Sequence, residues 1–264
     1  MNALLGVPSW VIPGTYGENL RFLDLKREIQ TVELLFFIYD EEVRGLLERE
    51  YELIRSYGSR FTFTAHLPDP LLPKHEELVE RLAPWVRHFV VHPGPLDTID
   101  RTLSLLDSWE EKFRMIKGTT IQGIKTGDSN IEQPPDTFRN PAPAGRFLLE
   151  NTQNGLLEAL LQRRAHSPIC MDTGHLLLSG ISPLDFYHRH GERIGEIHLH
   201  GVDHQGVDHQ AAREDALLPD HRGIDGTEGW FLELQGVLKE FPGVINVEVF
   251  SWGEAERTLR ALKG

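Results

Sequence analysis

The sequence contains very little cysteine, since Cys170 is the only one among 264 residues. A single thiol excludes an intramolecular disulfide framework, and this one lies inside an apolar run, so a reducing compartment is the simpler expectation. Long apolar runs are missing as well. No stretch approaches the about 18 residues of a membrane-spanning helix, and residues 1–11 lack the basic start of a secretory signal. These absences predict a soluble cytoplasmic protein without a membrane segment.

Basic residues are outnumbered, with 27 lysines and arginines against 40 aspartates and glutamates and a formal net charge of -13. Nucleic-acid binding usually depends on a basic surface, and the sequence offers only a local pair at Arg163 and Arg164. The acidity therefore disfavours nucleic acid as a partner. Bound metal would offset some of the carboxylates.

Short apolar segments alternate with longer amphipathic ones along the chain. This alternation is typical of repeated β-α units around a parallel sheet, and eight is the number of strands that closes a barrel. We therefore predict a single-domain (β/α)8 TIM barrel of the α/β class over residues 1–264. The predicted strands are Ala3–Val7, Val32–Ile38, Phe61–His66, His88–His92, Arg146–Glu150, Ile169–Asp172, Ile194–His200 and Val244–Val249.

Amphipathic segments predict the helices. These are Glu18–Glu28, Glu41–Tyr57, Lys74–Leu82, Asp97–Ile116, Asn154–Arg164, Pro183–His190, Glu228–Phe241 and Glu254–Leu262. Two segments interrupt the pattern. Lys117–Ala144 is rich in glycine and proline, and we expect a long loop there that shapes the substrate pocket. Gly201–Gly226 follows the seventh strand and is rich in histidine, aspartate and glycine.

Side chains that can bind a metal stand at the carboxyl ends of the third to the eighth predicted strand. In a parallel barrel these ends meet at one mouth, where the catalytic residues of such enzymes lie. Any one of these residues alone is more often structural, but a buried ring of them needs cations to balance its charge. The residues are His66, His92, Glu150, Asp172 with His175, His198 with His200, and Glu248.

The segment Ile169–His175 carries a strong local signal. If its strand ends at Asp172, the Thr-Gly pair turns the chain and brings His175 back over the same edge, so that two ligands for a divalent cation converge. The alternative is that Asp172 caps a helix and His175 lies in its first turn.

The number of candidate ligands bears on the reaction. A one-metal sugar isomerase needs only about four side chains. Here these would be Glu150, Asp172, His198 and Glu248. The further histidines predict two or three divalent cations per chain, with zinc first and manganese or iron as alternatives. Clustered cations are a device for phosphoryl transfer, so the excess of histidines favours hydrolysis over isomerisation.

Strand by strand, these residues resemble the metal site of the xylose-isomerase-like TIM-barrel superfamily, and particularly its endonuclease IV branch, which has a trinuclear zinc centre. The resemblance implies that Glu150 bridges two metals. The other implied ligands of the first metal are His66 and His92, and those of the second are Asp172, His198 and Glu248. The implied ligand of the third metal is His175.

The chain departs from that family after the seventh strand. Where the family has an Asp-x-His pair that completes the third site, this sequence has only adjacent Asp-His pairs, at Asp203-His204, Asp208-His209 and Asp220-His221. Either His209 or His221 could complete the third metal site, and the sequence leaves both open.

Short segments also resemble the cobamide-remodelling phosphodiesterases of the same superfamily. They are Pro8–Thr15, Glu18–Leu23, His198–Val202 and Glu248–Phe250. This resemblance implies hydrolysis of the phosphodiester in the nucleotide loop of a corrinoid. We therefore expect a metal-dependent hydrolase that acts on a small phosphodiester.

Three alternatives stay open. A single-metal sugar isomerase or epimerase would use Glu150 and Glu248, the candidate catalytic residues, as acid and base across the metal. An endonuclease IV-like enzyme would cut DNA at abasic sites, although the acidity disfavours this. A barrel that only binds a ligand or partner would have no need to keep Glu150, Asp172 and Glu248 together.

Overall fold

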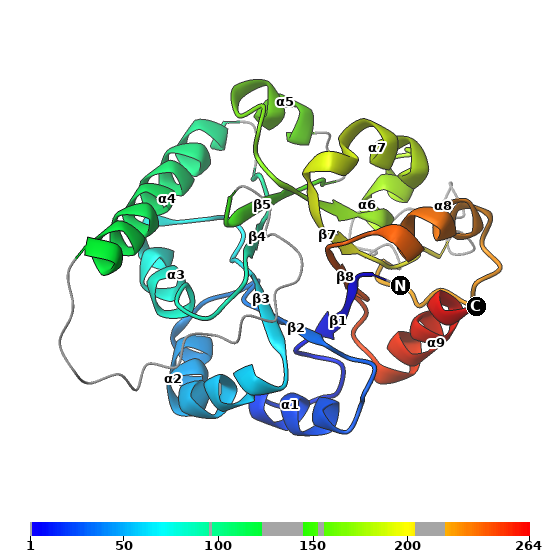
Figure 1. Ribbon diagram of the computed structural model, residues 1–264, viewed down its shortest axis with the longest axis horizontal. Coiled ribbons are helices and arrows are strands. Elements are labelled where there is room, and N and C mark those ends of the chain that lie inside the picture. Colours follow the sequence, from blue (N-terminus) through cyan, green and yellow to red (C-terminus); the bar gives the residue numbers. More distant parts are fainter. Residues whose placement is uncertain (1, 95–96, 123–144, 153–155, 204–219) are drawn as a thin grey trace, which may run out of the picture.

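The computed structural model describes residues 2–94, 97–122, 145–152, 156–203 and 220–264. Eight parallel strands form one closed barrel in sequence order, with β1 paired to both β2 and β8, and helices surround the ring (Figure 1). This is the predicted TIM-barrel fold. The strands are β1 (Leu4–Pro8), β2 (Thr31–Leu35), β3 (Thr62–His66), β4 (Phe89–Val91), β5 (Phe147–Glu150), β6 (Ile169–Asp172), β7 (Ile194–His198) and β8 (Val244–Asn246).

The strands are buried on both faces, as parallel strands covered by helices must be. Every residue of β2 and of β7 is buried. All eight predicted strands are present, but four end earlier than predicted. β2 ends at Leu35, not Ile38; β4 at Val91, not His92; β7 at His198, not His200; and β8 at Asn246, not Val249. Beyond these points the backbone leaves the strand pairing and builds the rim of the mouth.

The helices alternate with the strands and lie outside them (Figure 1). They are α1 (Tyr16–Asp24), α2 (Glu41–Ser56), α3 (Glu76–Leu82), α4 (Ile99–Gln122), α5 (Leu156–Arg163), α6 (Thr173–Leu178), α7 (Pro183–His190), α8 (Gly229–Glu240) and α9 (Trp252–Lys263). Side-chain caps fix several starts: Thr15 and Glu18 form a capping box at α1, and Ser182 caps α7 just before Pro183. In the described part of the chain, no helix is long and apolar enough to cross a membrane.

The first helix is shifted from the predicted Glu18–Glu28, because α1 begins at Tyr16 and ends at Asp24, and two further helical features bear on the prediction. Asp172 caps α6, as the alternative predicts, because its side chain accepts a hydrogen bond of 2.6 Å from the backbone N–H of His175. The strand also ends at Asp172 as predicted, and the capping does not remove Asp172 from the ligand-type residues at the mouth. α4 continues to Gln122, so the predicted start of a loop at Lys117 is wrong. A single glycine costs a helix only about 1 kcal/mol, and Gly118 does not end α4. The rest of that predicted loop, 123–144, lies outside the described residues.

The interior of the barrel is divided into an apolar and a polar part. Val90, Leu148 and Cys170, on β4, β5 and β6, form a small apolar cluster that is separate from the main core between strands and helices. The interior of a TIM barrel is normally filled by branched apolar side chains. Here β2 and β7 instead contribute Glu33 and Glu196, both fully buried. The polar part lies below the mouth and includes His198, which also belongs to the mouth.

Candidate metal centre at the barrel mouth

Ligand-type side chains from several strand ends converge at the mouth. Among the described residues, three groups at the mouth place their ligand atoms within 4.8 Å of one another. They are His66, His92 and Glu150; Glu150, Asp172, His198 and Glu248; and His200, His221 and Glu248. Glu150 and Glu248 each belong to two groups, so the three groups form one continuous cluster.

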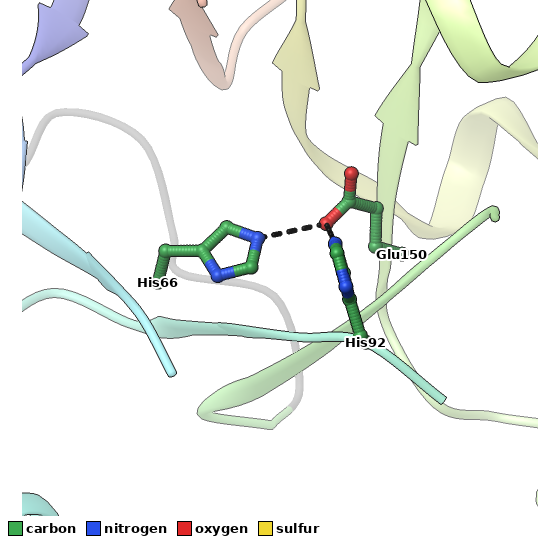
Figure 2. Close-up of side chains that lie close together, drawn as sticks. All are labelled: His66, His92 and Glu150. Carbon is green, nitrogen blue, oxygen red and sulfur yellow. Dashed lines mark hydrogen bonds and ion pairs between the residues drawn. The ribbon is translucent and has the colours of Figure 1, made fainter. Parts of the chain in front are cut away.

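In the first group, two imidazoles point at the same oxygen of Glu150 (Figure 2). His66 Nε2 and His92 Nε2 each lie 3.1 Å from Glu150 Oε2. The opposite ring nitrogens have acceptors of their own, with His66 Nδ1 3.1 Å from the carbonyl oxygen of Leu67 and His92 Nδ1 3.2 Å from Asp69 Oδ2. An acceptor at Nδ1 fixes the tautomer and leaves Nε2 as the ligand nitrogen.

The second group surrounds the other oxygen of Glu150. His198 Nδ1 lies 3.6 Å from Glu150 Oε1 and 3.0 Å from Glu248 Oε2. Asp172 is held in place by Asn151, which accepts a hydrogen bond from the backbone N–H of Asp172 and donates one to its carbonyl oxygen, at 2.8 and 2.9 Å. The four ligand side chains of this group are buried.

His200 extends the cluster beyond His198. Residues two apart in an extended chain point to the same side, so both imidazoles face the mouth. His200 Nε2 lies 3.0 Å from Asp172 Oδ2, and its Nδ1 lies 3.3 Å from Asp220 Oδ1. The sequence places His200 among the metal-competent side chains without assigning it to a metal, and it does not predict Asp220 as a ligand. His200 belongs to the third ligand group, and Asp220 lies beside it.

His221 completes the third group. Its ring lies 4.4 Å from that of His200, and its Nδ1 lies 3.8 Å from Glu248 Oε2. A short antiparallel bridge between Gly201 and Arg222, with hydrogen bonds of 2.7 and 3.0 Å, fixes the backbone beside it. His221 has a φ of 56°, a left-handed conformation that is uncommon outside glycine and that concentrates at functional sites.

His175 and His209 are the two other predicted ligands of the third site. His175 lies at the mouth, but its Nδ1 donates to the carbonyl oxygen of Asn151 at 2.9 Å, and its Nε2 faces Asp220 Oδ2 at 3.9 Å. It is therefore adjacent to the three groups rather than a member of one, and its role as a ligand stays a prediction. His209 lies outside the described residues.

Gly174 makes room for His200. A Cβ atom at Gly174 would overlap the imidazole of His200. The hydroxyl of Thr173 also holds this histidine, because it donates to the carbonyl oxygen of His200 at 2.7 Å and accepts from its N–H at 3.0 Å. The Thr-Gly pair thus has a second purpose besides turning the chain between Asp172 and His175.

Histidines balance the buried carboxylates electrostatically. Burial alone would raise the pKa of Glu150, but the charge of His92 and hydrogen bonds from neighbouring histidines hold it well below its usual value. Burial lowers the pKa of His92, yet the charge of Glu150 and the hydrogen bond to Asp69 outweigh this and raise it to about 10. For His200, burial is outweighed by Asp172, and the pKa rises to about 9.

The donor set fits divalent transition metals. Imidazole nitrogens and carboxylate oxygens are ligands of zinc, manganese and iron. In addition, His198 Nδ1 and Glu248 Oε2 are buried and face each other at 3.0 Å, but within the described part of the chain neither makes a hydrogen bond of good geometry. Two such orphaned donor atoms are expected where a cation lies between them.

Substitution of Gly174 tests how His200 is placed. In Gly174→Ala the new methyl group must displace His200 or the backbone, and overpacking of this kind costs about 1–3 kcal/mol. We expect this loss in the free energy of unfolding, measured with urea. Gly236→Ala in α8 is the matched control, because nothing lies within 4 Å of its new Cβ atom and alanine favours a helix. Equal stability of the two variants would contradict the assigned position of His200.

No family model matches the chain, and no curated protein matches it. Solved structures do. The probable 3-DHS dehydratase AsbF involved in petrobactin synthesis from Bacillus anthracis has a TM-score of 0.59 and 14% identity, over 100% of this chain and 98% of that one. A xylose isomerase domain containing protein from Salmonella typhimurium has a TM-score of 0.53 and 16% identity, over 100% and 94%.

A sugar phosphate isomerase/epimerase from Parabacteroides distasonis has a TM-score of 0.55 and 11% identity, over 93% of this chain and 89% of that one. At such low identity the likeness concerns the fold alone. The chain shares its TIM-barrel fold with these three proteins.

Proposed function

We propose that this protein is a metal-dependent hydrolase of small phosphodiesters, with a multinuclear centre at the barrel mouth. The observation that carries the proposal is that Glu150 and Glu248 are each shared between two ligand groups. Glu150 presents Oε2 to His66 and His92 and Oε1 to His198, which suits it to bridge two cations, whereas Glu248 faces the histidines of its two groups with the same oxygen, Oε2. When bound, such cations supply Lewis-acid stabilisation of charge on a phosphoryl group and lower the pKa of water.

The proposed ligands follow the three groups. His66, His92 and Glu150 would hold one cation, and Glu150 with Asp172, His198 and Glu248 a second. The ligands of a third would be His200, His221 and Glu248, with His175 and Asp220 next to them. His200 thus takes a place that the sequence prediction left to His209 or His221 alone.

The surroundings of the two shared carboxylates support a role as ligands rather than as acid and base. Burial would raise both pKa values, but the neighbouring histidines, His92 for Glu150 and His198 for Glu248, lower them. A general acid needs a raised pKa so that it holds a proton near neutral pH. Glu150 and Glu248 are therefore proposed to stay charged and to hold the cations in place.

The charge of the protein supports a small substrate. The only basic pair singled out in the sequence, Arg163 and Arg164, lies on α5 and the turn after it, where both side chains pair with acidic residues of α4. Exposed aromatic surface at the rim includes Phe250, whose ring lies 4.8 Å from that of His221. A phosphodiester with an apolar, planar part fits this combination. The nucleotide loop of a corrinoid is the leading specific candidate.

A single-metal sugar isomerase or epimerase is the second candidate. One observation favours it, because Glu150, Asp172, His198 and Glu248 form a complete ligand set without the other histidines. One of the similar solved structures is also described as a sugar phosphate isomerase/epimerase. In that case His66 would only orient hydroxyl groups of the substrate.

The role of Glu150 is tested by Glu150→Gln. The amide keeps the shape of the side chain but loses the charge and one ligand oxygen. We expect at least one fewer metal ion per chain by elemental analysis, and a loss of phosphodiesterase activity of at least about 100-fold. Glu110→Gln is the control, since Glu110 is a partly buried carboxylate that pairs with Arg164 far from the mouth. Full metal content and activity in Glu150→Gln would show that the centre is wrongly placed.

Metal loading should release protons. The pKa values of His92 and His200, about 10 and about 9, mean that both rings are doubly protonated at pH 7.5 without metal. A nitrogen that binds a metal must first lose its proton, so we expect these two rings to release about two protons per chain, in addition to protons from His198, and an affinity that falls as the pH is lowered. Calorimetry in buffers of different ionisation enthalpy measures this number. Release that is unchanged in His92→Gln would remove this histidine from the ligand set.

The substrate class is tested with one panel under identical metal conditions: a corrinoid phosphodiester, a DNA duplex with an abasic site, and a set of ketoses. We expect hydrolysis of the corrinoid phosphodiester and little action on the duplex, because an acidic surface cannot hold a polynucleotide. Efficient incision of the duplex alone would refute the substrate. Turnover of a ketose alone would refute the reaction class and establish the isomerase alternative.

A further inference from the structure

A second cluster of polar side chains lies inside the barrel, below the mouth. Glu33 comes from β2, Glu196 and His198 from β7, and Asn246 from β8, while His88 directly precedes β4. All five are at most 1% exposed. They occupy the part of the interior that branched apolar residues fill in other barrels. In such a buried cluster each charge must be paired and each polar atom must have a hydrogen-bond partner or a bound ion.

One oxygen of each glutamate is held by a neighbour. The side-chain N–H of Asn246 donates to Glu33 Oε2, and His88 Nε2 contacts Glu196 Oε2. The other two oxygens face the same ring nitrogen. Glu33 Oε1 lies 3.3 Å and Glu196 Oε1 3.9 Å from His198 Nε2. Neither oxygen, nor this nitrogen, has a hydrogen bond of acceptable geometry within the described residues.

A proton on His198 Nε2 serves only one of the two carboxylate oxygens. Burial raises the pKa of Glu33 and of Glu196, the latter to about 7, so the second charge in this dry interior calls for either a further proton or a cation. A metal ion serves both at once. With metal–ligand bonds of about 2.0–2.2 Å in a tetrahedral site, the ligand atoms lie about 3.4 Å apart. The separation to Glu33 Oε1 is close to this value, and Glu196 Oε1 would have to move inward from 3.9 Å.

We propose that a divalent transition-metal ion binds inside the barrel between Glu33, Glu196 and Nε2 of His198. Asn246 and His88 would then be the outer partners that orient the two carboxylates. The candidate fourth donor is the hydroxyl of Thr64, which lies in register with Glu33 on β3 and is buried without a hydrogen-bond partner in the described structure.

His198 connects this interior site to the mouth. Its Nε2 faces the interior carboxylates, while its Nδ1 lies 3.0 Å from Glu248 Oε2 at the mouth. With a metal ion on each nitrogen the ring is an imidazolate, and both ring protons are released to solvent as the ions bind. The interior ion does not depend on which reaction the mouth catalyses.

The decisive experiment locates the ions in the wild-type protein. Crystals of the full chain grown with zinc are measured above and below the zinc absorption edge. An anomalous peak between Glu33, Glu196 and His198, about 2.1 Å from Nε2, is the expected result. Zinc at the mouth with none at this interior position overturns the inference and leaves the proposed function intact. Zinc inside with none at the mouth does the reverse.

A metal count provides the second measurement. The double variant Glu33→Gln/Glu196→Gln should bind one zinc ion fewer per chain than the wild type, while Glu48→Gln, at an exposed carboxylate on α2, should bind the same number as the wild type. The variant Glu150→Gln should keep the interior peak. An unchanged count in the double variant overturns the inference. If the double variant does not fold, the wild-type anomalous map still decides.

Discussion

The burial of Glu150 is the constraint on which the mouth of the barrel depends. This carboxylate is 1% exposed, so water cannot stabilise its charge. An isolated buried carboxylate would destabilise the folded state by more than the net stability of a typical domain. Imidazoles of His66, His92 and His198 surround its two oxygens. The histidines must therefore hold protons or metal ions for the barrel to fold around this charge. The same physical requirement that stabilises the fold assembles a set of ligands.

Closure of the barrel decides which of these groups meet. Glu33 on β2 and Glu196 on β7 are separated by β8 and β1, and they reach the same nitrogen of His198 only because the ring is complete. The alternation of side chains along each strand then sets the depth of each residue. On β7, Glu196 and His198 point inward one step apart, and His200 follows at the rim. One strand thus supplies polar groups to the interior, the mouth and the rim in turn.

The sequence revealed the strands and most of the mouth because both follow local rules. Apolar segments of strand length located all eight strands, and the residue at each strand end located His66, Glu150 and Asp172. The sequence places His200 among the metal-competent side chains but assigns it to no metal site, because strand alternation cannot show that the chain beyond His198, where β7 ends, brings it to His221 and Glu248. Glu33 and Glu196 were not recognised, since each stands alone in an apolar segment. Their proximity depends on closure of the barrel, which no local pattern encodes.

The sharing of carboxylates is what separates the two proposed reactions. TIM barrels carry many chemistries on one scaffold, so a likeness in fold at 11–16% identity does not choose among them. A mononuclear site built on Glu150 Oε1 would leave Oε2 to two histidines whose opposite nitrogens are already held by acceptors. That arrangement orients two ligand nitrogens with no ion to bind. A second cation at Oε2 would give both of them a partner, and this is the geometric argument for the proposed multinuclear centre.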